Sequence, residues 1–464
     1  MSRDSASLSW IERPFAALLR LAWPIAVSML SYSAMTFVDT LFVARLGTAS
    51  LAGMGLAFVA GFALLCFPLG LLQGVKVLVS QAIGAGRHGD IDAYLRAGLL
   101  LALVLGLAIA GLAYLLPPLI DMIAASPEAG SVASTYLRIR MLSAPVFLVF
   151  AALRETAYGT GDTRGPMLAS LIANLANIAL CALFVLGFDL GVVGVAWATV
   201  CANFVEAGVL VGARPDLVRR TLSRVGLAQP WGPPVLAVWR MGWATGVQFV
   251  LEVGSFSLLT IMVSARGELE MAAHQIVLQV LHLAFLPVQA MGEAGSVLTG
   301  QAVGADRDDL VVAMARRTLL VAGGFALLCT LVCIFGAPWV LRAFTSAPDL
   351  TGLGVELMHI ATLFLIVDAC NVAARSVLRG TGDVRFAAVI GIACAWCMTP
   401  PLTWLLGYHL EMGVRGAWLG LCAEIFLGTA ILWLRVLRGG WRQAAARSRA
   451  EVLHAQHAPI GSGA

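Results

Sequence analysis

Runs of apolar residues long enough to cross a lipid bilayer follow one another along the whole chain, separated by short polar segments. A helix needs roughly 20 apolar residues to cross the hydrocarbon core of a membrane. In that core every backbone polar group must find a partner within the protein, and a helix supplies these partners itself. The ~10-residue alternating segments of a membrane β-barrel are absent from the sequence. The chain is therefore expected to be an all-α integral membrane protein.

The composition agrees with this fold class. Hydrophobic residues make up 60% of the 464 residues and charged residues only 12%, whereas a soluble domain has about 25% charged residues. The hydropathy between charged loops predicts twelve spans, near residues 16–43, 52–82, 94–116, 133–158, 166–187, 191–212, 235–264, 271–300, 310–337, 353–378, 386–407 and 414–436. The first residues are charged and lack a small-residue cleavage site, so no removable signal peptide is expected.

Arginine is distributed unevenly over the two sides of the predicted bundle. When both termini are placed on one side, the other side holds only Arg45, Arg138, Arg140, Arg266, Arg342 and Arg415. The first side collects the other arginines, among them Arg154, Arg375 and Arg379. Because positively charged loops stay in the cytoplasm, both termini are predicted to be cytoplasmic in a bacterial inner membrane. The net charge of +4 is then a topology signal, and no nucleic-acid partner is expected.

The two halves of the chain resemble each other. SQAIGAGRHGD at 80–90 recurs as GQAVGADRDD at 300–309, RETAYGTGDTR at 154–164 as RSVLRGTGDVR at 375–385, and GVVGVAW at 191–197 as GVRGAW at 413–418. An even number of spans in each half predicts two parallel six-helix lobes related by an axis along the membrane normal. The predicted division is a tail at 1–14, an N-lobe at 15–212, a linker at 213–232, a C-lobe at 233–438 and a tail at 439–464.

The glycine-rich GTGD repeats are predicted to end helices rather than to bind phosphate. No strand precedes them and no GK[ST] follows, as a phosphate-binding loop would require. Glycine commonly ends helices because it adopts the left-handed backbone conformation without strain. The sequence contains no ATPase motif, so an ion gradient or the gradient of the substrate itself would have to drive transport. Cys394 and Cys397 form the one CxxC pair and lack a second Cys or His pair, so no metal site and no cofactor are expected.

Five segments resemble the MATE (multidrug and toxic compound extrusion) family, particularly its NorM-like branch. In chain order they are LAWPIAVSMLSYSAMTFVDTLFVARLG at 21–47, VSQAIGAG at 79–86, LEVGSF at 251–256, AAHQI at 272–276 and VLRGTGD at 377–383. The resemblance implies two lobes that alternate between inward- and outward-facing states. It also implies export of cationic, often aromatic, small molecules in exchange for H+ or Na+. We expect a monomer in the lipid bilayer.

Three carboxylates lie within predicted spans: Asp39 in the first, Glu252 in the seventh and Asp368 in the tenth. A charge at bilayer depth costs at least a few kcal/mol, so each needs a partner, a cavity or a function. Polar contacts between helices are one reading. Cation or proton coupling is the other, and the resemblance implies it, because the NorM-like branch uses these acidic positions. Glu252 and Asp368 are then expected to face each other, with a cation between them or a proton on one of them.

The resemblance also implies a set of residues around Asp39, matched here by Asn177, Cys181 and Thr199. Cys181 departs from the family pattern, which has Asn or Asp at this position. A thiol is a poor ligand for sodium, which prefers oxygen. Asn174 lies on nearly the same helix face and could supply the missing oxygen, or could be a packing amide. The sequence therefore leaves a sodium site in the N-lobe open, while Asp39 could still exchange a proton.

Other polar residues in the spans are candidates for a cavity or a gate. Lys76 is predicted to extend its amine to the membrane surface, and an ion pair with Glu293 in the other lobe is the alternative. Glu206 and Glu424, in the sixth and twelfth spans, could line helix contacts or a cavity. His274 could titrate near neutral pH, or be a hydrogen-bonded packing histidine.

Four alternatives make different demands on the sequence. An exporter of one endogenous metabolite would share the fold, as would a flippase for a lipid-linked precursor, but the flippase should have a strongly basic cavity for a pyrophosphate headgroup. A membrane enzyme would need a cluster of catalytic ligands, and His274 and His282 lack a second set. A major-facilitator transporter would have an Asp-Arg-rich loop where this chain has GAGRHGDI. The chain is therefore not expected to be an enzyme.

Overall fold

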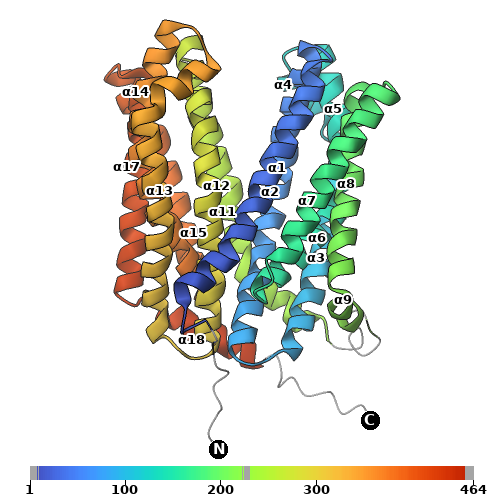
Figure 1. The fold of residues 1–464 in the computed structure, drawn as a ribbon, viewed down its shortest axis with the longest axis vertical. Coiled ribbons are helices and arrows are strands. Elements are labelled where there is room, and N and C mark those ends of the chain that lie inside the picture. The colour runs from blue at the N-terminus through green and yellow to red at the C-terminus, as the bar shows by residue number, and fades with distance from the viewer. Residues whose placement is uncertain (1–7, 9, 222, 224–229, 455–464) are drawn as a thin grey trace, which may run out of the picture. The chain divides into compact units, whose positions relative to one another are not determined.

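The computed structural model describes residues 8, 10–221, 223 and 230–454, and this part of the chain is helical with no strand (Figure 1). The all-α prediction is confirmed. The first half contains α1 (Pro14–Ala44), α2 (Thr48–Gly84), α3 (Gly89–Leu112), α4 (Pro117–Ile123), α5 (Pro127–Met141), α6 (Ala144–Gly159), α7 (Arg164–Cys181), η1 (Ala182–Gly187), α8 (Gly191–Ala213) and α9 (Pro215–Thr221). The second half contains α11 (Gly232–Ser264), α12 (Glu268–Gly304), α13 (Asp309–Phe344), α14 (Pro348–Gly380), α15 (Val384–Cys397), α16 (Thr399–Leu402), η2 (Thr403–His409), α17 (Gly413–Leu437) and α18 (Arg442–His454).

Eleven spans in the described part of the chain are long and apolar enough to cross a membrane, and α5 with α6 forms a twelfth if this bent pair counts as one span. The protein is thus a multi-span membrane protein, as predicted. Of the predicted polar segments, residues 1–7 and 9, much of the linker (222 and 224–229) and the tail from 455 lie outside the described residues.

The predicted continuous span at 133–158 is wrong in one respect, because the helix bends by 50° between α5 and α6. Pro145 follows the break, and a proline has no N–H to donate to the preceding turn. At the break the Ser143 hydroxyl donates to the Arg140 carbonyl at 2.8 Å, and Asn203 on α8 donates to the same hydroxyl at 2.8 Å. At Gly106 on α3 a Cβ atom would lie 2.4 Å from the Pro145 Cα. The backbone of α3 therefore fits against the bend only because residue 106 is glycine.

The chain divides into two compact units. The N unit comprises Val27–Gly246, and the C unit comprises the described residues up to Ala26 together with Val247–Leu453. The boundaries fall inside α1 and α11, so the first part of α11 belongs to the N unit, whereas the predicted lobes assigned each helix whole to one side. A Cβ atom at Gly242 would lie 1.9 Å from the Leu71 carbonyl oxygen on α2. This glycine contact joins the first part of α11 to the N unit.

The internal repeat predicted from sequence is confirmed by the backbone. The positive φ angles of Gly47 and Gly161, 111° and 86°, recur at Gly267 and Gly382 as 129° and 83°. The π-helical turn η1 that ends the seventh helix recurs as η2 after α16. Each pair lies 220 to 222 residues apart in the sequence. The two halves therefore share their turns as well as their spans.

Each half contains an equivalent ion pair, which explains the aspartate of the GTGD motif. Asp162, in the turn after α6, accepts from Arg214 at the end of α8 at 2.6 Å. Asp383, in the turn after α14, accepts from Arg435 near the end of α17 at 2.9 Å. The GTGD segments thus end helices, as predicted, and join each turn to the last long helix of the same repeat.

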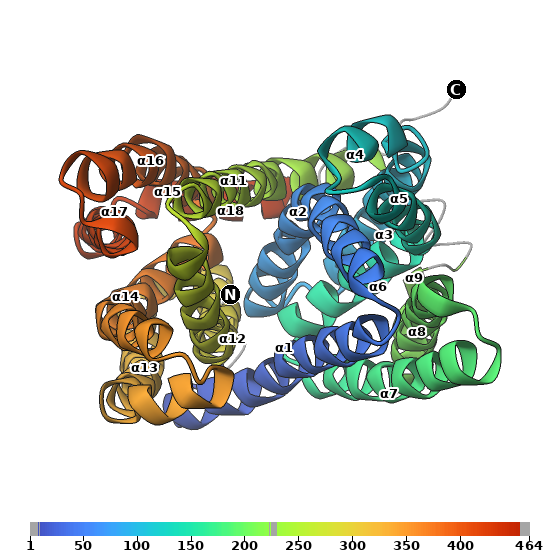
Figure 2. The ribbon, with the colours of Figure 1, turned by 90° about the horizontal axis from the view of Figure 1, so that it is seen from above.

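Packing within the C unit brings α12, α13 and α14 side by side (Figures 1 and 2). Buried small and aliphatic residues fill this core, with Ala273, Ala326, Ala361 and Leu357 fully enclosed. Large apolar side chains such as Phe335 and Trp339 on α13 are exposed, as expected for helices whose outer faces meet lipid.

The last part of the chain, predicted as a tail, contains the helix α18. Trp441 precedes this helix and is buried in the C unit core. Arg449 on α18 pairs with Asp308 at 2.8 Å and with Asp306 at 2.9 Å, in the turn between α12 and α13. The described residues of the tail are therefore a folded part of the C unit.

Candidate ion-coupling sites

The Asp39 carboxylate on α1 lies among the residues predicted for it. It is only 4% exposed. The Cys181 thiol donates to Oδ1 at 3.3 Å and the Thr199 hydroxyl lies 3.4 Å from Oδ2. Asn177, one turn before Cys181 on α7, donates to the Thr199 hydroxyl at 3.5 Å. The structure thus brings these four side chains together from α1, α7 and α8.

Asn174 does not join this group. Its amide donates to the Ser31 hydroxyl on α1 at 2.6 Å. Of the two readings of Asn174, the packing amide fits this contact. Asn177 is the amide that contacts the residues around Asp39.

A cation near Asp39 was missed by the sequence reasoning. Arg140, near the end of α5, interacts electrostatically with Asp39, and its guanidinium donates to the Tyr136 hydroxyl at 3.4 Å. The sequence analysis assigned Arg140 to the side opposite the termini, although it lies within the predicted span 133–158. An arginine inside the bend between α5 and α6 gives Asp39 a countercharge supplied by the protein.

Glu252 on α11 forms an ion pair with an arginine side chain. Arg375 Nη1 on α14 lies 3.1 Å from Oε1 and 3.2 Å from Oε2 of Glu252, and Gln248 donates to Oε1 at 2.8 Å. A Cβ atom at Gly391 on α15 would lie 2.7 Å from Glu252 Oε1 and 2.7 Å from Gln248 Nε2. Glycine at position 391 therefore leaves the space that this group of side chains needs.

Arg375 was not foreseen as a partner of Glu252. It lies inside α14, within the predicted span 353–378 and before the helix ends at Gly380. Glu252 and Asp368, which were expected to face each other, interact electrostatically, and the guanidinium of Arg375 lies against Glu252. Arg379, just past the end of that predicted span, is buried on the same helix and stacks over the Phe249 ring at 5.5 Å.

Asp368 lies two helical turns before Arg375 on α14 and is 6% exposed. Its Oδ2 atom has no hydrogen-bond partner among the described residues. Asp368 interacts electrostatically with Arg375 and Glu252. Glu424 on α17 interacts electrostatically with the same three residues, so the C unit gathers three carboxylates around one guanidinium.

The N unit holds a second buried carboxylate, Glu206 on α8, which is 1% exposed. The Tyr32 hydroxyl on α1 and the Ser170 hydroxyl on α7 both donate to Oε1 of Glu206, the latter at 2.7 Å. Arg154 on α6 interacts electrostatically with Tyr32 and Glu206. Glu206 therefore joins three helices by hydrogen bonds, and a cation of a fourth helix interacts with it electrostatically.

Lys76 does not extend to the surface, so that expectation is wrong. Its side chain is 2% exposed, and its amine lies 3.5 Å from Glu155 on α6. Arg154 pairs with the same carboxylate at 3.0 Å. A buried carboxylate on the neighbouring helix lets the lysine stay inside the protein. Glu293, in the C unit, interacts electrostatically with Arg379.

Of the two readings of His274 on α12, the packing histidine fits its surroundings, but without the hydrogen bond that this reading included. Neither ring nitrogen has a hydrogen-bond partner among the described residues. The imidazole lies between the rings of Phe256 and Trp418, with centroid distances of 6.4 and 5.8 Å. His274 thus occupies an aromatic environment away from the carboxylates.

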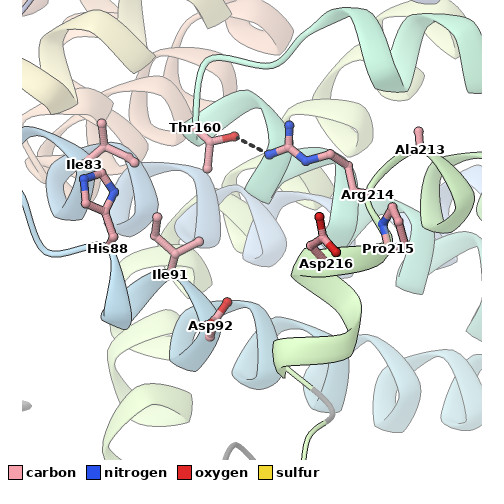
Figure 3. A pocket seen from close by; sticks show the side chains of 9 residues that line it. All are labelled: Ile83, His88, Ile91, Asp92, Thr160, Ala213, Arg214, Pro215 and Asp216. Atoms are coloured by element: carbon pink, nitrogen blue, oxygen red, sulfur yellow. Dashed lines mark hydrogen bonds between the residues drawn. The ribbon is translucent and has the colours of Figure 1, made fainter.

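A polar pocket of about 440 Å³ lies in the N unit where α2 meets α3 and α8 meets α9 (Figure 3). His88, Asp92 and Asp216 contribute to its lining, and Arg214 donates to the Thr160 hydroxyl at 3.3 Å. None of the residues predicted for coupling lines this pocket. Over the described residues, no group of three or more His, Cys, Asp and Glu side chains is arranged for a metal.

These features define an all-α, multi-span membrane protein with two repeated halves and buried carboxylates in each unit. The MatE family profile matches residues 24–183 and 244–405, one match in each half. The chain belongs to the MATE family of multidrug efflux transporters.

Curated relatives carry the name NorM. The chain is 30% identical over 440 residues to the probable multidrug resistance protein NorM of Pseudomonas aeruginosa, covering 90% of this chain and 89% of the relative. It is 30% identical over 424 residues to the protein of the same name in Deinococcus radiodurans, covering 89% and 92%. The sequence-based recognition of a NorM-like MATE protein is confirmed.

Solved structures share the fold. An outward-facing multidrug resistance MATE family transporter superposes with a TM-score of 0.84 at 22% identity, covering 94% of this chain and 96% of that one. A transporter of the same superfamily from Pyrococcus furiosus superposes with a TM-score of 0.86 at 21% identity, covering 94% and 97%. The two-half helical architecture is therefore that of this family.

Proposed function

We propose that this protein is a secondary active exporter that exchanges cationic, aromatic small molecules for H+ or Na+ by alternating access. The observation that carries the proposal is a buried carboxylate within a span of each unit, Asp39 in α1 and Asp368 in α14, both less than a tenth exposed. Membership of the MATE family and the names of the NorM relatives support the substrate class. The bacterial relatives and the arginine distribution support the inner membrane, with both termini in the cytoplasm.

The exchange follows from competition for negative charge. A buried carboxylate is stabilised by a proton, a metal cation or a cationic substrate, and one site cannot accommodate two of them at once. A substrate cation that binds therefore displaces the coupling ion, and the returning ion displaces the substrate. If the two occupants favour different conformations, the ion gradient drives the substrate outward.

Asp39 is proposed to exchange a proton. The nearest group is the Cys181 thiol, at 3.3 Å from Oδ1, and sulfur is a poor ligand for a hard cation such as Na+. Thr199 and Asn177 add a hydroxyl and an amide oxygen to the two oxygens of Asp39 itself, but the sulfur occupies the position beside Oδ1. The donor set thus suits a carboxyl group that gains and loses a proton.

Flux in proteoliposomes tests the proposal. Vesicles hold ethidium, and a pH gradient or a sodium gradient is imposed separately. Wild-type protein should accelerate ethidium movement under at least one gradient, and Asp39→Asn and Asp368→Asn should each slow it by about tenfold or more, because the exchangeable charge is lost. Glu356→Gln, which removes an exposed carboxylate paired with Arg415 at 2.5 Å, is the matched control. Normal gradient-driven flux in both Asp variants would overturn the proposal.

No observation favours the flippase alternative. A flippase for a lipid-linked precursor would need free cations for a pyrophosphate headgroup. The partly buried arginines Arg154 and Arg375 each pair with a carboxylate, at 3.0 and 3.1 Å.

A further inference from the structure

A second polar pocket of the N unit, with a volume of about 620 Å³, lies between α4 and α5. α4 stands at the opposite end of this unit from α9 and the pocket of Figure 3 (Figure 1). The candidate span α3 connects the two ends, so the second pocket lies near one membrane surface, which is the outer surface on the proposed topology. Its polar lining consists of Asp121, Ser126, Ser131, Ser134, Thr135 and Arg138.

One face of α5 is polar along most of its length. Ser131, Ser134, Thr135 and Arg138 follow one another at intervals of three or four residues, which places them on one side of the helix. All four line the pocket. Because polar groups in contact with hydrocarbon are costly, a helix with such a face at a membrane surface needs a polar partner there.

Ser134 supplies a hydrogen-bonding group without a partner. Its side chain is 7% exposed, and its hydroxyl has no hydrogen-bond partner among the described residues. A buried hydroxyl on a helix can donate to its own backbone, as Thr156 on α6 does to the Ala152 carbonyl at 2.9 Å. A buried hydroxyl without such a bond costs free energy, so a hydrogen-bond acceptor in the pocket would stabilise Ser134.

Two opposite charges line the pocket without pairing. Asp121 on α4 lies against α5 at Gly130, where a Cβ atom would be 2.9 Å from its Oδ1. Arg138 comes eight residues after Gly130, about 12 Å along the helix, and its guanidinium lies 5.9 Å from the centre of the Tyr114 ring. Neither Asp121 nor Arg138 forms an ion pair with a residue that the structure describes. The pocket therefore offers a carboxylate and a guanidinium to the two ends of one ligand.

Apolar side chains of α4 are exposed beside this polar pocket. Leu119, Met122 and Ile123, together with Leu115 just before the helix, are between 54% and 82% exposed. With seven residues, α4 is too short to cross a membrane, so this apolar face meets lipid near the membrane surface. A polar pocket beside an apolar face matches a phospholipid, which carries a charged headgroup on apolar chains.

We propose that the pocket between α4 and α5 binds the headgroup of a phospholipid with a primary ammonium group, as in phosphatidylethanolamine. The ammonium group pairs with Asp121, the phosphate pairs with Arg138, and Ser134 donates to a phosphate oxygen. The acyl chains lie on the exposed face of α4. The lipid is a resident of the protein surface, and the inference does not depend on the exported substrate or the coupling ion.

The two charges also predict which phospholipids are disfavoured. Phosphatidylglycerol has the phosphate but no cation for Asp121, so the carboxylate repels its negative charge. Phosphatidylcholine has a cation, but its quaternary nitrogen has no N–H to donate to the carboxylate. Both lipids should therefore bind more weakly than phosphatidylethanolamine.

Native mass spectrometry of delipidated protein in detergent measures this preference. The three lipids, with identical acyl chains, are titrated separately, and phosphatidylethanolamine should bind at least about fivefold more tightly than the other two. Asp121→Asn should reduce the preference to about twofold or less, because it removes the partner of the ammonium group. Arg138→Gln should weaken the binding of all three lipids, by about fivefold or more for phosphatidylethanolamine. Glu128→Gln, which removes a carboxylate in the first turn of α5 outside the pocket lining, should match the wild type.

A photoactivatable phosphatidylethanolamine locates the bound lipid. With a diazirine close to the headgroup, it should label peptides that contain α4 or the start of α5, and an excess of the unlabelled lipid should prevent this. Arg138→Gln should lose this labelling while labelling of other peptides persists. Thermal unfolding in lipid-free detergent shows which variants have kept their fold, so that lost binding is not mistaken for lost structure.

Three results would overturn the proposal. They are equal affinities of the wild type for the three lipids, an undiminished preference in Asp121→Asn, and labelling confined to other helices. None of them would affect the proposed ion-coupled export, which the flux measurements test separately.

Discussion

At the scale of single residues, charge inside a span is tolerated when a neighbouring helix supplies its partner. Asp39, Asn177, Cys181 and Thr199 could be predicted as a group, because the family pattern and helical spacing place them on facing helices. The pairing of Arg140, Glu155 and Arg375 could not be predicted. These residues lie within the predicted spans 133–158 and 353–378, but hydropathy does not show which helices meet, and paired charges are tolerated there only within the folded protein.

Cys181 offers a direct test of ion choice in the N unit. Cys181→Asn replaces a sulfur 3.3 Å from Asp39 Oδ1 with an amide that carries an oxygen, the ligand that sodium prefers. We expect ethidium flux at constant pH to become dependent on sodium, or more strongly dependent than in the wild type. The measurement compares flux in sodium and in choline buffers. Cys397→Asn, at an exposed thiol, is the control. If the sodium dependence of flux were unchanged in Cys181→Asn, the sulfur of Cys181 would not be what disfavours sodium at this site.

At the scale of helices, glycine allows two helix backbones to approach each other closely. Turn glycines such as Gly161 and Gly382 could be predicted from the repeated GTGD motif. The glycines inside long helices could not, because their partners lie far away in sequence. Gly242 on α11 contacts Leu71 on α2 so closely that a Cβ atom would lie 1.9 Å from the Leu71 carbonyl oxygen. An apolar run in the sequence gives no sign of this contact.

Gly242→Ala should therefore destabilise the protein. Overpacking of a close contact costs about 1–3 kcal/mol, because α2 and α11 must move apart to admit the methyl group. We expect the temperature of unfolding in detergent to fall by several degrees, measured by scanning fluorimetry. Gly208→Ala on α8, where a Cβ atom would meet nothing within 4 Å, should leave it unchanged or raise it slightly. Equal unfolding temperatures for the two variants would refute the close contact.

At the scale of the whole molecule, the halves share a backbone but differ in charge. The twelve-span, all-α architecture and its repeat could be predicted from sequence, because span length and the offset between motifs are local properties. The distribution of countercharge could not, since it depends on which helices meet. Tyr32 in the N unit and Glu252 in the C unit stand at equivalent repeat positions but have different partners, because the Tyr32 hydroxyl donates to Glu206 and the Glu252 carboxylate pairs with Arg375.

Counterflow in sealed proteoliposomes tests obligatory exchange most directly. Vesicles are loaded with ethidium, the pH and sodium concentration are equal on both sides, and a dye inside reports protons or sodium. As ethidium leaves, protons or sodium ions should enter although neither ion has a concentration gradient at the start. Asp368→Asn should abolish this entry. Ethidium efflux by the wild type with no accompanying ion movement would contradict antiport.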